Sequence, residues 1–246
     1  MRDATPTTIY LKDYAPFGYT VDEVHLTFDL SPNSTRVKSR IRFSPAPEAS
    51  DRRFFLHGEQ LTLISARIDG TPVTPQISEQ GLTCAVPDTP FVWEAEVEID
   101  PAGNTALEGL YMSNGMYCTQ CEAEGFRKIT YYPDRPDVMA RFRTRIEANK
   151  DAYPVLLSNG NDVEKGELEN GRHFVTWEDP FPKPSYLFAL VAGDLRCHGG
   201  SFKTMSGRDV RLEIWVEPQN IDRCEHALRS LQKSMKWDEE CYGREY

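Results

Sequence analysis

A ten-residue stretch of the chain, CTQCEAEGFR, carries two kinds of chemically useful side chain. Cys118 and Cys121 form a Cys-x-x-Cys pair, a spacing that binds zinc or undergoes reversible oxidation in many proteins. Gln120 and Glu122 offer an amide and a carboxylate. That second pair suits an ammonium group, because the carboxylate supplies the opposite charge and the amide oxygen accepts another N–H.

The expected backbone of this stretch argues against a joint role for the two thiols. An Asn-Gly pair at 114–115 predicts a hairpin turn, with 116–120 as the returning strand. Side chains alternate along a strand, so Cys118 and Cys121 are expected on opposite faces, with Cα atoms about 10 Å apart. A disulfide needs less than about 7 Å, and zinc needs a second ligand pair with suitable spacing, which the sequence does not offer. A thiol redox protein therefore stays only as an alternative.

The same argument brings Gln120 and Glu122 together. Two residues apart in an extended chain, they share one face of the strand. Spacing alone still favours a solvated strand end, since a glutamate in that position is usually part of the surface. A ligand role needs support from the rest of the chain.

Composition and charge narrow the class of protein. The chain has 246 residues, of which 39% are hydrophobic and 27% charged, as in globular proteins with a buried core. The formal net charge is −10. We therefore expect neither nucleic acid nor an anionic membrane surface as a partner, because both reward an excess of Lys and Arg. Six cysteines without a recognisable secretion signal or membrane-spanning run predict free thiols in the cytoplasm.

Most of the sequence predicts β-structure. Apolar and polar residues alternate at 24–30, 36–43 and 93–99, which is typical of strands with one solvated face. Asp-Gly and Asn-Gly pairs at 69–70 and 170–171 predict two more tight hairpins. We therefore predict a mostly β fold, in which the first part is a saddle-shaped antiparallel β-sandwich domain.

A domain boundary is predicted between 1–193 and 194–246. The second part begins with a strand pair, roughly 200–205 and 209–217, before the first convincing helix. Apolar residues at helical spacing predict this helix. We expect Asn220 or Asp222 to cap its start, and we expect it to end near Gly243. This β-β-α tail is expected to be too small for a core of its own.

Charged residues follow the opening stretch in YYPDRPD. Asp134, Arg135 and Asp137 are expected to order a turn around two prolines rather than to perform acid–base chemistry. Arg127 or Arg135 is expected to pair with a nearby carboxylate.

Longer segments resemble the aminopeptidase N (alanyl aminopeptidase) family of zinc exopeptidases, in its bacterial branch. The segment at 118–138, CTQCEAEGFRKITYYPDRPDV, is similar to the Thr-Gln-x-Glu-Ala segment of that family and its Asp-x-Pro continuation. The resemblance continues in order and covers nearly the whole chain, through IYLKDYAPFGYTVDEVHLTFDL, NTALEGLYMSNGMYCTQCEAEGF, LLSNGN, GELENGRHFVTWEDPFPKPSYLFALVAGDL and SLQKSMKWDEE.

This resemblance implies a saddle-shaped β domain followed by a thermolysin-like catalytic domain, of which 194–246 would be the opening β-β-α. In the family, the catalytic domain binds zinc through the two histidines of a His-Glu-x-x-His motif and a later glutamate. The glutamate between the histidines activates the zinc-bound water. The N-terminal domain contributes the Gln and Glu of its Thr-Gln-x-Glu segment, which help bind the free α-amino group of the substrate. Those positions match Gln120 and Glu122 here, so peptides with a free N-terminus are the expected substrates.

The zinc motif itself does not occur in this sequence. The five histidines are His25, His57, His173, His198 and His226, and no two of them are four residues apart. The family's Gly-Ala-Met-Glu-Asn loop is also missing. We therefore expect no catalytic residue and no metal ligand in 1–246, and we interpret the chain as an N-terminal portion that is inactive without its missing catalytic domain. A stand-alone β-sandwich module that binds peptides or proteins is the alternative.

Overall fold

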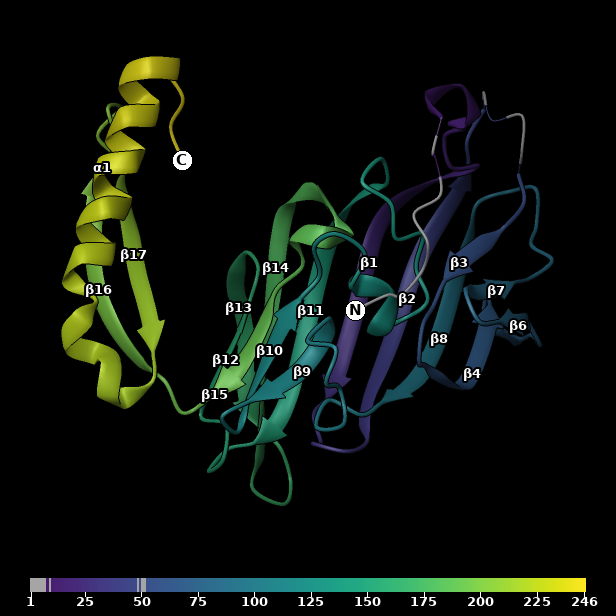
Figure 1. Cartoon of the computed structure of the whole chain (residues 1–246), viewed down its shortest axis with the longest axis horizontal. Coiled ribbons are helices and arrows are strands. Elements are labelled where there is room, and N and C mark those ends of the chain that lie inside the picture. The colour runs from purple at the N-terminus through teal and green to yellow at the C-terminus, as the bar shows by residue number, and fades with distance from the viewer. Residues whose placement is uncertain (1–7, 9, 48, 50–51) are drawn as a thin grey trace. The chain divides into compact units, whose positions relative to one another are not determined.

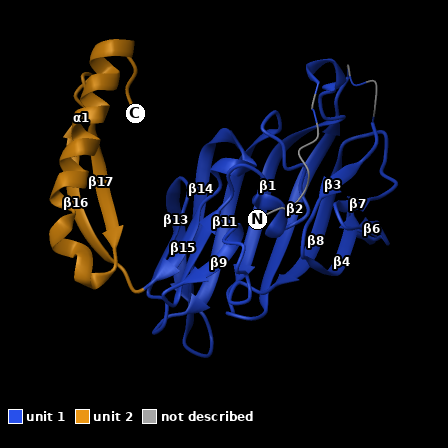
Figure 2. Ribbon diagram, in the orientation of Figure 1, with its two compact units in different colours: residues 1–193 blue, residues 194–246 orange. Residues whose placement is uncertain are grey.

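The structure is a computed structural model that describes residues 8, 10–47, 49 and 52–246. The chain divides into two compact units, Met1–Gly193 and Asp194–Tyr246 (Figure 2). Within the described residues, no helix combines the length and the apolar character that crossing a bilayer requires.

An eight-stranded sheet is the largest element of the first unit (Figure 1). Its strands follow the order β13-β14-β11-β1-β2-β8-β4-β5. Their bounds are Tyr19–Asp29 (β1), Thr35–Pro45 (β2), Thr62–Ile68 (β4), Thr71–Pro72 (β5), Phe91–Ile99 (β8), Met139–Asn149 (β11), Asn161–Glu167 (β13) and Arg172–Pro184 (β14).

Alternation in the sequence places the core on one face of this sheet, as predicted. Along β8, every odd-numbered residue is buried and every even-numbered residue is half-buried. Trp93 and Val97 are fully enclosed, while Glu94, Glu96 and Glu98 lie on the other face beside the basic residues of β2. Burial of the apolar side chains stabilises the sheet by about 25 cal/mol per Å² of apolar surface.

The three predicted tight turns are confirmed by their backbone angles. Both residues of each pair have positive φ: Asp69-Gly70 at 49° and 78°, Asn114-Gly115 at 50° and 79°, and Asn170-Gly171 at 58° and 69°. Glycine and asparagine enter this region at the lowest cost, which is why these dipeptides specify hairpins.

One strand pair differs from the predicted antiparallel arrangement. β1 pairs with β11 in parallel, from Glu23 opposite Arg141 to Asp29 opposite Glu147. Hairpin signals act only between neighbouring strands, whereas these two are separated by a long connection that can place them in either direction. The large sheet is therefore mixed, although every other pair within it is antiparallel.

Two smaller sheets complete the first unit. One has the order β12-β15-β10-β9 and the other β3-β7-β6. Their bounds are Phe55–His57 (β3), Gln76–Ser78 (β6), Gly81–Thr83 (β7), Gly109–Ser113 (β9), Met116–Gln120 (β10), Val155–Ser158 (β12) and Leu190–Gly193 (β15), and short 3-10 helices cover Leu11–Asp13 (η1), Phe126–Lys128 (η2) and Ser185–Leu187 (η3). Phe126 of η2 packs edge-on against Tyr132, Phe142 and Phe188 in the core.

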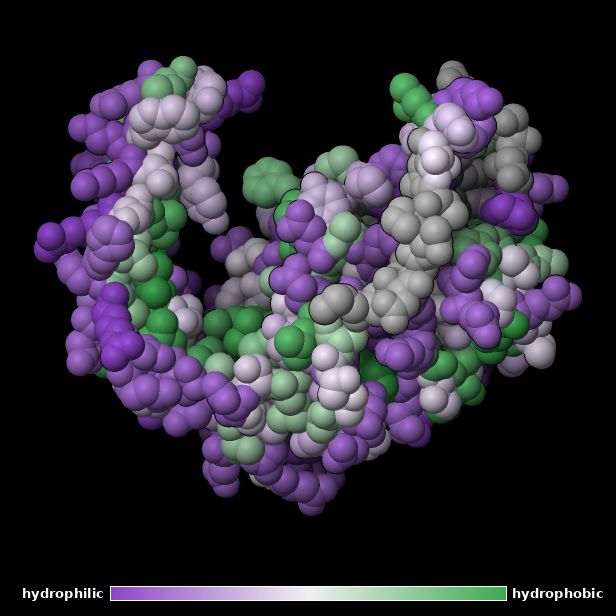
Figure 3. Space-filling model, in the orientation of Figure 1, coloured by the Kyte–Doolittle hydropathy of each residue, from purple (hydrophilic) through white to green (hydrophobic). Residues whose placement is uncertain are grey.

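The second unit is a hairpin covered by one helix. Strands β16 (Arg196–Lys203) and β17 (Asp209–Val216) precede the 3-10 helix η4 (Pro218–Arg223) and α1 (Glu225–Tyr242). In Figure 3, hydrophilic side chains cover much of the visible surface of α1. A small core does exist here, contrary to expectation: Val210, Leu212 and Leu228 are buried together.

The ends of α1 show one correct and one wrong prediction. The helix ends at Gly243, whose φ of 62° is the left-handed conformation expected there. Asn220 and Asp222 do not cap its start, because both lie within η4, which begins at Pro218. The residue before α1 is Cys224, which makes no side-chain cap hydrogen bond.

Candidate substrate-binding turn

The hairpin of β9 and β10 places Gln120 at the exposed end of β10. Their register runs from Met116 opposite Ser113 to Gln120 opposite Gly109. The strand ends at Gln120, and the chain turns at 122–125 before entering η2. We call residues 120–125 the acidic turn.

Within the acidic turn, Gln120 and Glu122 both have exposed side chains. Nε2 of Gln120 donates a hydrogen bond to the backbone oxygen of Glu122 at 3.2 Å, which leaves the amide oxygen of Gln120 as an acceptor. Among the described residues, none forms a hydrogen bond or ion pair with the Glu122 carboxylate. A turn, not the extended chain that we expected, brings these two residues together; the Glu122–Ala123 peptide bond within it is cis.

Glycines allow the acidic turn to lie directly against the hairpin. A Cβ on Gly125 would stand 2.3 Å from the backbone oxygen of Gln120 and 2.9 Å from the nitrogen of Gly109. Gly109 itself has a φ of 72°. Gly125 also closes the turn, since its N–H donates to the backbone oxygen of Cys121 at 2.8 Å. The turn is therefore held by backbone contacts at its first and last residues.

A buried ion pair follows directly after the acidic turn. The side chain of Arg127 reaches Asp134, with its Nε 3.1 Å from Oδ2. The backbone N–H of Arg127 donates to the same oxygen, and Nη2 donates to the backbone oxygen of Asp134, each at 3.1 Å. Arg127 also lies 3.4 Å from the Glu124 carboxylate in the turn. Charged hydrogen bonds of this kind fix geometry more strongly than neutral ones.

Two further segments converge on Asp134. Ser185 donates its hydroxyl to Oδ1 at 2.6 Å, and the N–H of Asp134 donates to Nδ1 of His57 at 3.2 Å. Burial, and next the positive charge of Arg127, hold the pKa of His57 below its usual value. Sequence reasoning missed His57 and Ser185, because each is distant along the chain and neither carries a local motif.

The expected structural role of the YYPDRPD segment is confirmed. Asp134 pairs with Arg127, and Arg135 makes two hydrogen bonds to Asp137, at 2.7 and 2.8 Å. These contacts order the chain between η2 and β11, so this segment supports the site rather than extending it.

No disulfide joins Cys118 and Cys121, the cysteines that flank Gln120. Cys118 lies half-buried in β10, whereas Cys121 lies beyond the strand and is 2% exposed. Burial, with a smaller effect from Asp134, raises the pKa of the Cys121 thiol. Because the thiolate is the reactive form, this environment makes Cys121 a packing residue.

Residues 15–187 match the family model of the peptidase M1 N-terminal domain. The chain belongs to the peptidase M1 family. Aminopeptidase N of Caulobacter vibrioides is 51% identical over 249 residues, which cover 100% of this chain and 29% of that protein. Aminopeptidase N of Escherichia coli is 52% identical over 98% of this chain and 28% of its own length. The predicted resemblance to bacterial aminopeptidase N is thereby confirmed, over less than a third of those relatives.

Solved structures of M1 proteins share the fold. Legionella pneumophila aminopeptidase A, solved in complex with aspartic acid, has a TM-score of 0.91 and 38% identity, over 96% of this chain and 28% of its own. An M1 zinc metallopeptidase from Deinococcus radiodurans, bound to a Tyr-Ser-Ala substrate, has a TM-score of 0.69 at 18% identity, which is a likeness of fold. The mostly β architecture is therefore that of this M1 domain.

The described residues of this M1 chain do not fit a zinc site. Across residues 8, 10–47, 49 and 52–246, no three His, Cys, Asp or Glu side chains are grouped to hold a metal ion. A zinc site needs about four converging nitrogen, sulfur or oxygen ligands.

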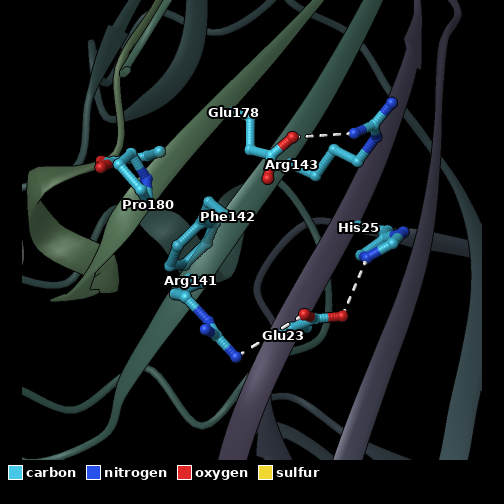
Figure 4. Close-up of a pocket in the computed structure, with 8 residues that line it drawn as sticks. Glu23, His25, Arg141, Phe142, Arg143, Glu178 and Pro180 are labelled. Atoms are coloured by element: carbon cyan, nitrogen blue, oxygen red, sulfur yellow. Dashed lines mark hydrogen bonds and ion pairs between the residues drawn. The ribbon is translucent and has the colours of Figure 1, made fainter. Parts of the chain in front are cut away.

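A hollow lies on the face of the eight-stranded sheet (Figure 4). Its charged residues pair with one another: Arg141 and His25 lie 3.7 and 3.4 Å from Glu23, and Arg143 lies 3.0 Å from Glu178. Such exposed pairs are typical of a solvated sheet face and contribute little stability. The hollow is lined from β1, β11 and β14, not from the acidic turn, and we assign it no ligand.

Proposed function

We propose that this chain is the N-terminal portion of a zinc aminopeptidase, which removes single residues from the N-terminus of peptides. In this proposal Glu122 and Gln120 bind the α-ammonium group of the substrate. The observation that carries the assignment is the exposed Glu122 carboxylate, which has no partner among the described residues, on a turn held at both ends. The whole-chain similarity to two bacterial proteins named aminopeptidase N supports the reaction class.

Such an enzyme must cleave only the first peptide bond of its substrate, and a fixed carboxylate can provide that selectivity. Zinc activates water equally well over any peptide bond, so the metal alone does not distinguish the first bond from the second. A carboxylate that pairs with the α-ammonium leaves only the first scissile carbonyl in a reactive position. A hydrogen bond to a charged group contributes about 1.5–3 kcal/mol, and its loss also removes this alignment.

In this proposal Gln120 contributes less than Glu122 to binding the α-ammonium group. Its amide oxygen is a neutral acceptor beside the carboxylate, and its amide nitrogen already bonds the turn at the Glu122 backbone. A neutral acceptor contributes about 0.5–1.5 kcal/mol, less than the charged one.

A peptide whose N-terminus is blocked has no ammonium group to pair with Glu122. We therefore expect the enzyme to reject blocked substrates strongly.

The remaining parts of the proposal concern the rest of the enzyme. Residues 194–246 would begin the catalytic domain, whose further residues would hold zinc and activate water. We propose the cytoplasm as the location, supported by six cysteines that form no disulfide among the described residues. Peptides with a free N-terminus and the catalytic domain are the proposed partners.

The test is to replace Glu122 in the full-length enzyme. Glu122→Gln keeps the size of the side chain and removes its charge, and we expect kcat/KM for a free peptide to fall by about tenfold or more while zinc remains bound. Gln120→Ala should cause a smaller loss. An unchanged kcat/KM for Glu122→Gln would remove Glu122 from the site, and a larger loss for Gln120→Ala would reverse the ranking.

A further inference from the structure

Asp134 is buried seven residues beyond Arg127 and is fully engaged inside the protein. Only 3% of the residue is exposed. Oδ2 accepts hydrogen bonds from the backbone N–H and the Nε of Arg127, and Oδ1 accepts from Ser185. Both carboxylate oxygens are thus used by protein donors, so Asp134 is placed to hold other groups and not to touch a ligand.

The group that Asp134 holds most firmly is the exit of the acidic turn. Arg127 follows Gly125 by two residues and donates three hydrogen bonds to Asp134. Its backbone oxygen also accepts from the N–H of Glu59 at 3.0 Å. From this fixed position the guanidinium reaches back to Glu124, 3.4 Å away inside the turn.

We propose that Asp134 is the positioning residue for Glu122. By fixing Arg127, it keeps the acidic turn in the conformation that presents the Glu122 carboxylate to the substrate's α-ammonium. The inference rests on the proposed function of Glu122 and adds a residue that never contacts substrate. Without the Asp134 charge, the buried guanidinium loses its buried carboxylate partner and keeps only the exposed Glu124, so the turn is held less firmly. Substrate binding must then order the turn, which weakens the selection of an α-amino group.

A conservative variant and a matched control separate positioning from general stability. Asp134→Asn keeps the shape of the side chain and one carbonyl acceptor but removes the charge. Asp179→Asn is the control, because Asp179 also forms a partly buried ion pair, 2.8 Å from Lys183 on β14. Neither Asp179 nor Lys183 has a hydrogen bond or ion pair to residues 120–127 within the described part of the chain.

The experiment uses the full-length enzyme and two competitive inhibitors that differ only in an α-amino group. The ratio of their inhibition constants measures recognition of the ammonium. Glu122→Ala should reduce this ratio by about tenfold or more, and Asp134→Asn by about three- to tenfold. Combined with Glu122→Ala, Asp134→Asn should change the ratio by less than about twofold, because its route through Glu122 is gone. Asp179→Asn should leave the ratio unchanged.

Each other outcome overturns a defined part of the argument. A ratio that is unaffected by Glu122→Ala ends the proposed function and, with it, this inference. A ratio that falls for Glu122→Ala but not for a folded Asp134→Asn ends the inference alone. An equal effect of Asp134→Asn with and without Glu122 also ends it, because Asp134 would then act independently.

A milder variant keeps the test decisive if Asp134→Asn does not fold. Ser185→Ala removes only the 2.6 Å hydrogen bond to Oδ1 and leaves the ion pair with Arg127 in place. We expect a smaller decrease of the same ratio, about twofold, and again no decrease in the Glu122→Ala background. No change in the ratio for folded Ser185→Ala, when Asp134→Asn is unfolded, would count against positioning.

Discussion

Thr119 and Leu190 exchange two hydrogen bonds through a single hydroxyl group. Oγ1 of Thr119 donates to the backbone oxygen of Leu190 at 3.1 Å and accepts from its N–H at 2.8 Å. The backbone ladder between β10 and β15 pairs Tyr117 with Ala192, and two residues further along the threonine side chain takes the place of the ladder. The residue just before Gln120 is thus tied to the neighbouring strand.

Removing this hydroxyl should therefore destabilise the protein. Thr119→Val keeps the shape but leaves the N–H and oxygen of Leu190 without that partner, which should lower the free energy of unfolding by about 1–3 kcal/mol. Urea unfolding of the 246-residue chain measures it. Thr119→Ser retains the hydroxyl and is the control. Equal stability of the Val and Ser variants would contradict the role of the hydroxyl.

Gly125→Ala should disturb the acidic turn through a clash. Gly125 has ordinary helical angles, φ −80° and ψ −18°, so backbone strain is not the reason. The added Cβ would meet the backbone oxygen of Gln120 at 2.3 Å. We expect a loss of about 1–3 kcal/mol in the free energy of unfolding.

The control for that substitution is another glycine with free space. A Cβ on Gly199 meets nothing nearer than the Leu212 backbone oxygen at 3.9 Å. Gly199→Ala should change the free energy of unfolding by less than about 1 kcal/mol. If the two alanine variants were equally stable, the close approach of Gly125 to Gln120 would be ruled out.

Protonation of His57 should destabilise the fold at low pH. Its Nδ1 accepts a hydrogen bond from the Asp134 N–H and so must lack a proton. Burial has the largest effect on its pKa, and Arg127, Asp134 and Glu124 are the charged groups that act on it. The pKa of His57 in the folded protein therefore lies below its ordinary value of about 6.5. The unfolded state therefore binds the proton first as pH falls, and the stability contributed by neutral His57 is present above about pH 6.5 and lost below it.

Chemical unfolding at several pH values tests this prediction. The free energy of unfolding of the native chain should decrease between about pH 7 and about pH 5 through this group. His57→Asn places an amide oxygen near the acceptor position without a titrating ring, so its decrease should be smaller. Parallel pH profiles for the two proteins would exclude His57 as a source of the dependence.

The chain alone should show neither peptidase activity nor stoichiometric zinc. The described residues offer no metal-binding group of three or more side chains. Metal analysis of the purified chain, with hydrolysis of a free amino-acid amide as the activity assay, checks both points. One tight zinc per chain, removable by a chelator with loss of activity, would overturn the view that the catalytic parts lie elsewhere.

Local sequence patterns predicted the strands and turns because their causes are local. Alternation predicted the buried face of β8, and Asn114-Gly115 predicted the hairpin that carries Gln120. The parallel pairing of β1 with β11 was not predictable in this way, since it depends on where a distant segment returns. The start of α1 was also misplaced, because Pro218 begins a 3-10 helix that the helical spacing does not reveal.

The sequence pointed to the residues of the candidate site but not to all of the buried contacts beneath it. The resemblance to the aminopeptidase N family pointed to Gln120 and Glu122, and their roles stay a prediction. The sequence indicated that Arg127 or Arg135 pairs with a nearby carboxylate, and both arginines do so. It did not indicate that Ser185 and His57 meet at Asp134, because a buried polar contact leaves no periodic signal.

The parallel pairing of β1 also has a consequence for biosynthesis. β1 lies between β2 and β11, and β2 follows it almost at once, whereas β11 is translated much later. Until Met139–Asn149 has left the ribosome, one side of β1 keeps its backbone N–H and C=O groups unpaired. Such an open edge readily joins with strands of other chains. The nascent polypeptide thus carries an open strand edge, a site at which chains can aggregate, until its eleventh strand emerges.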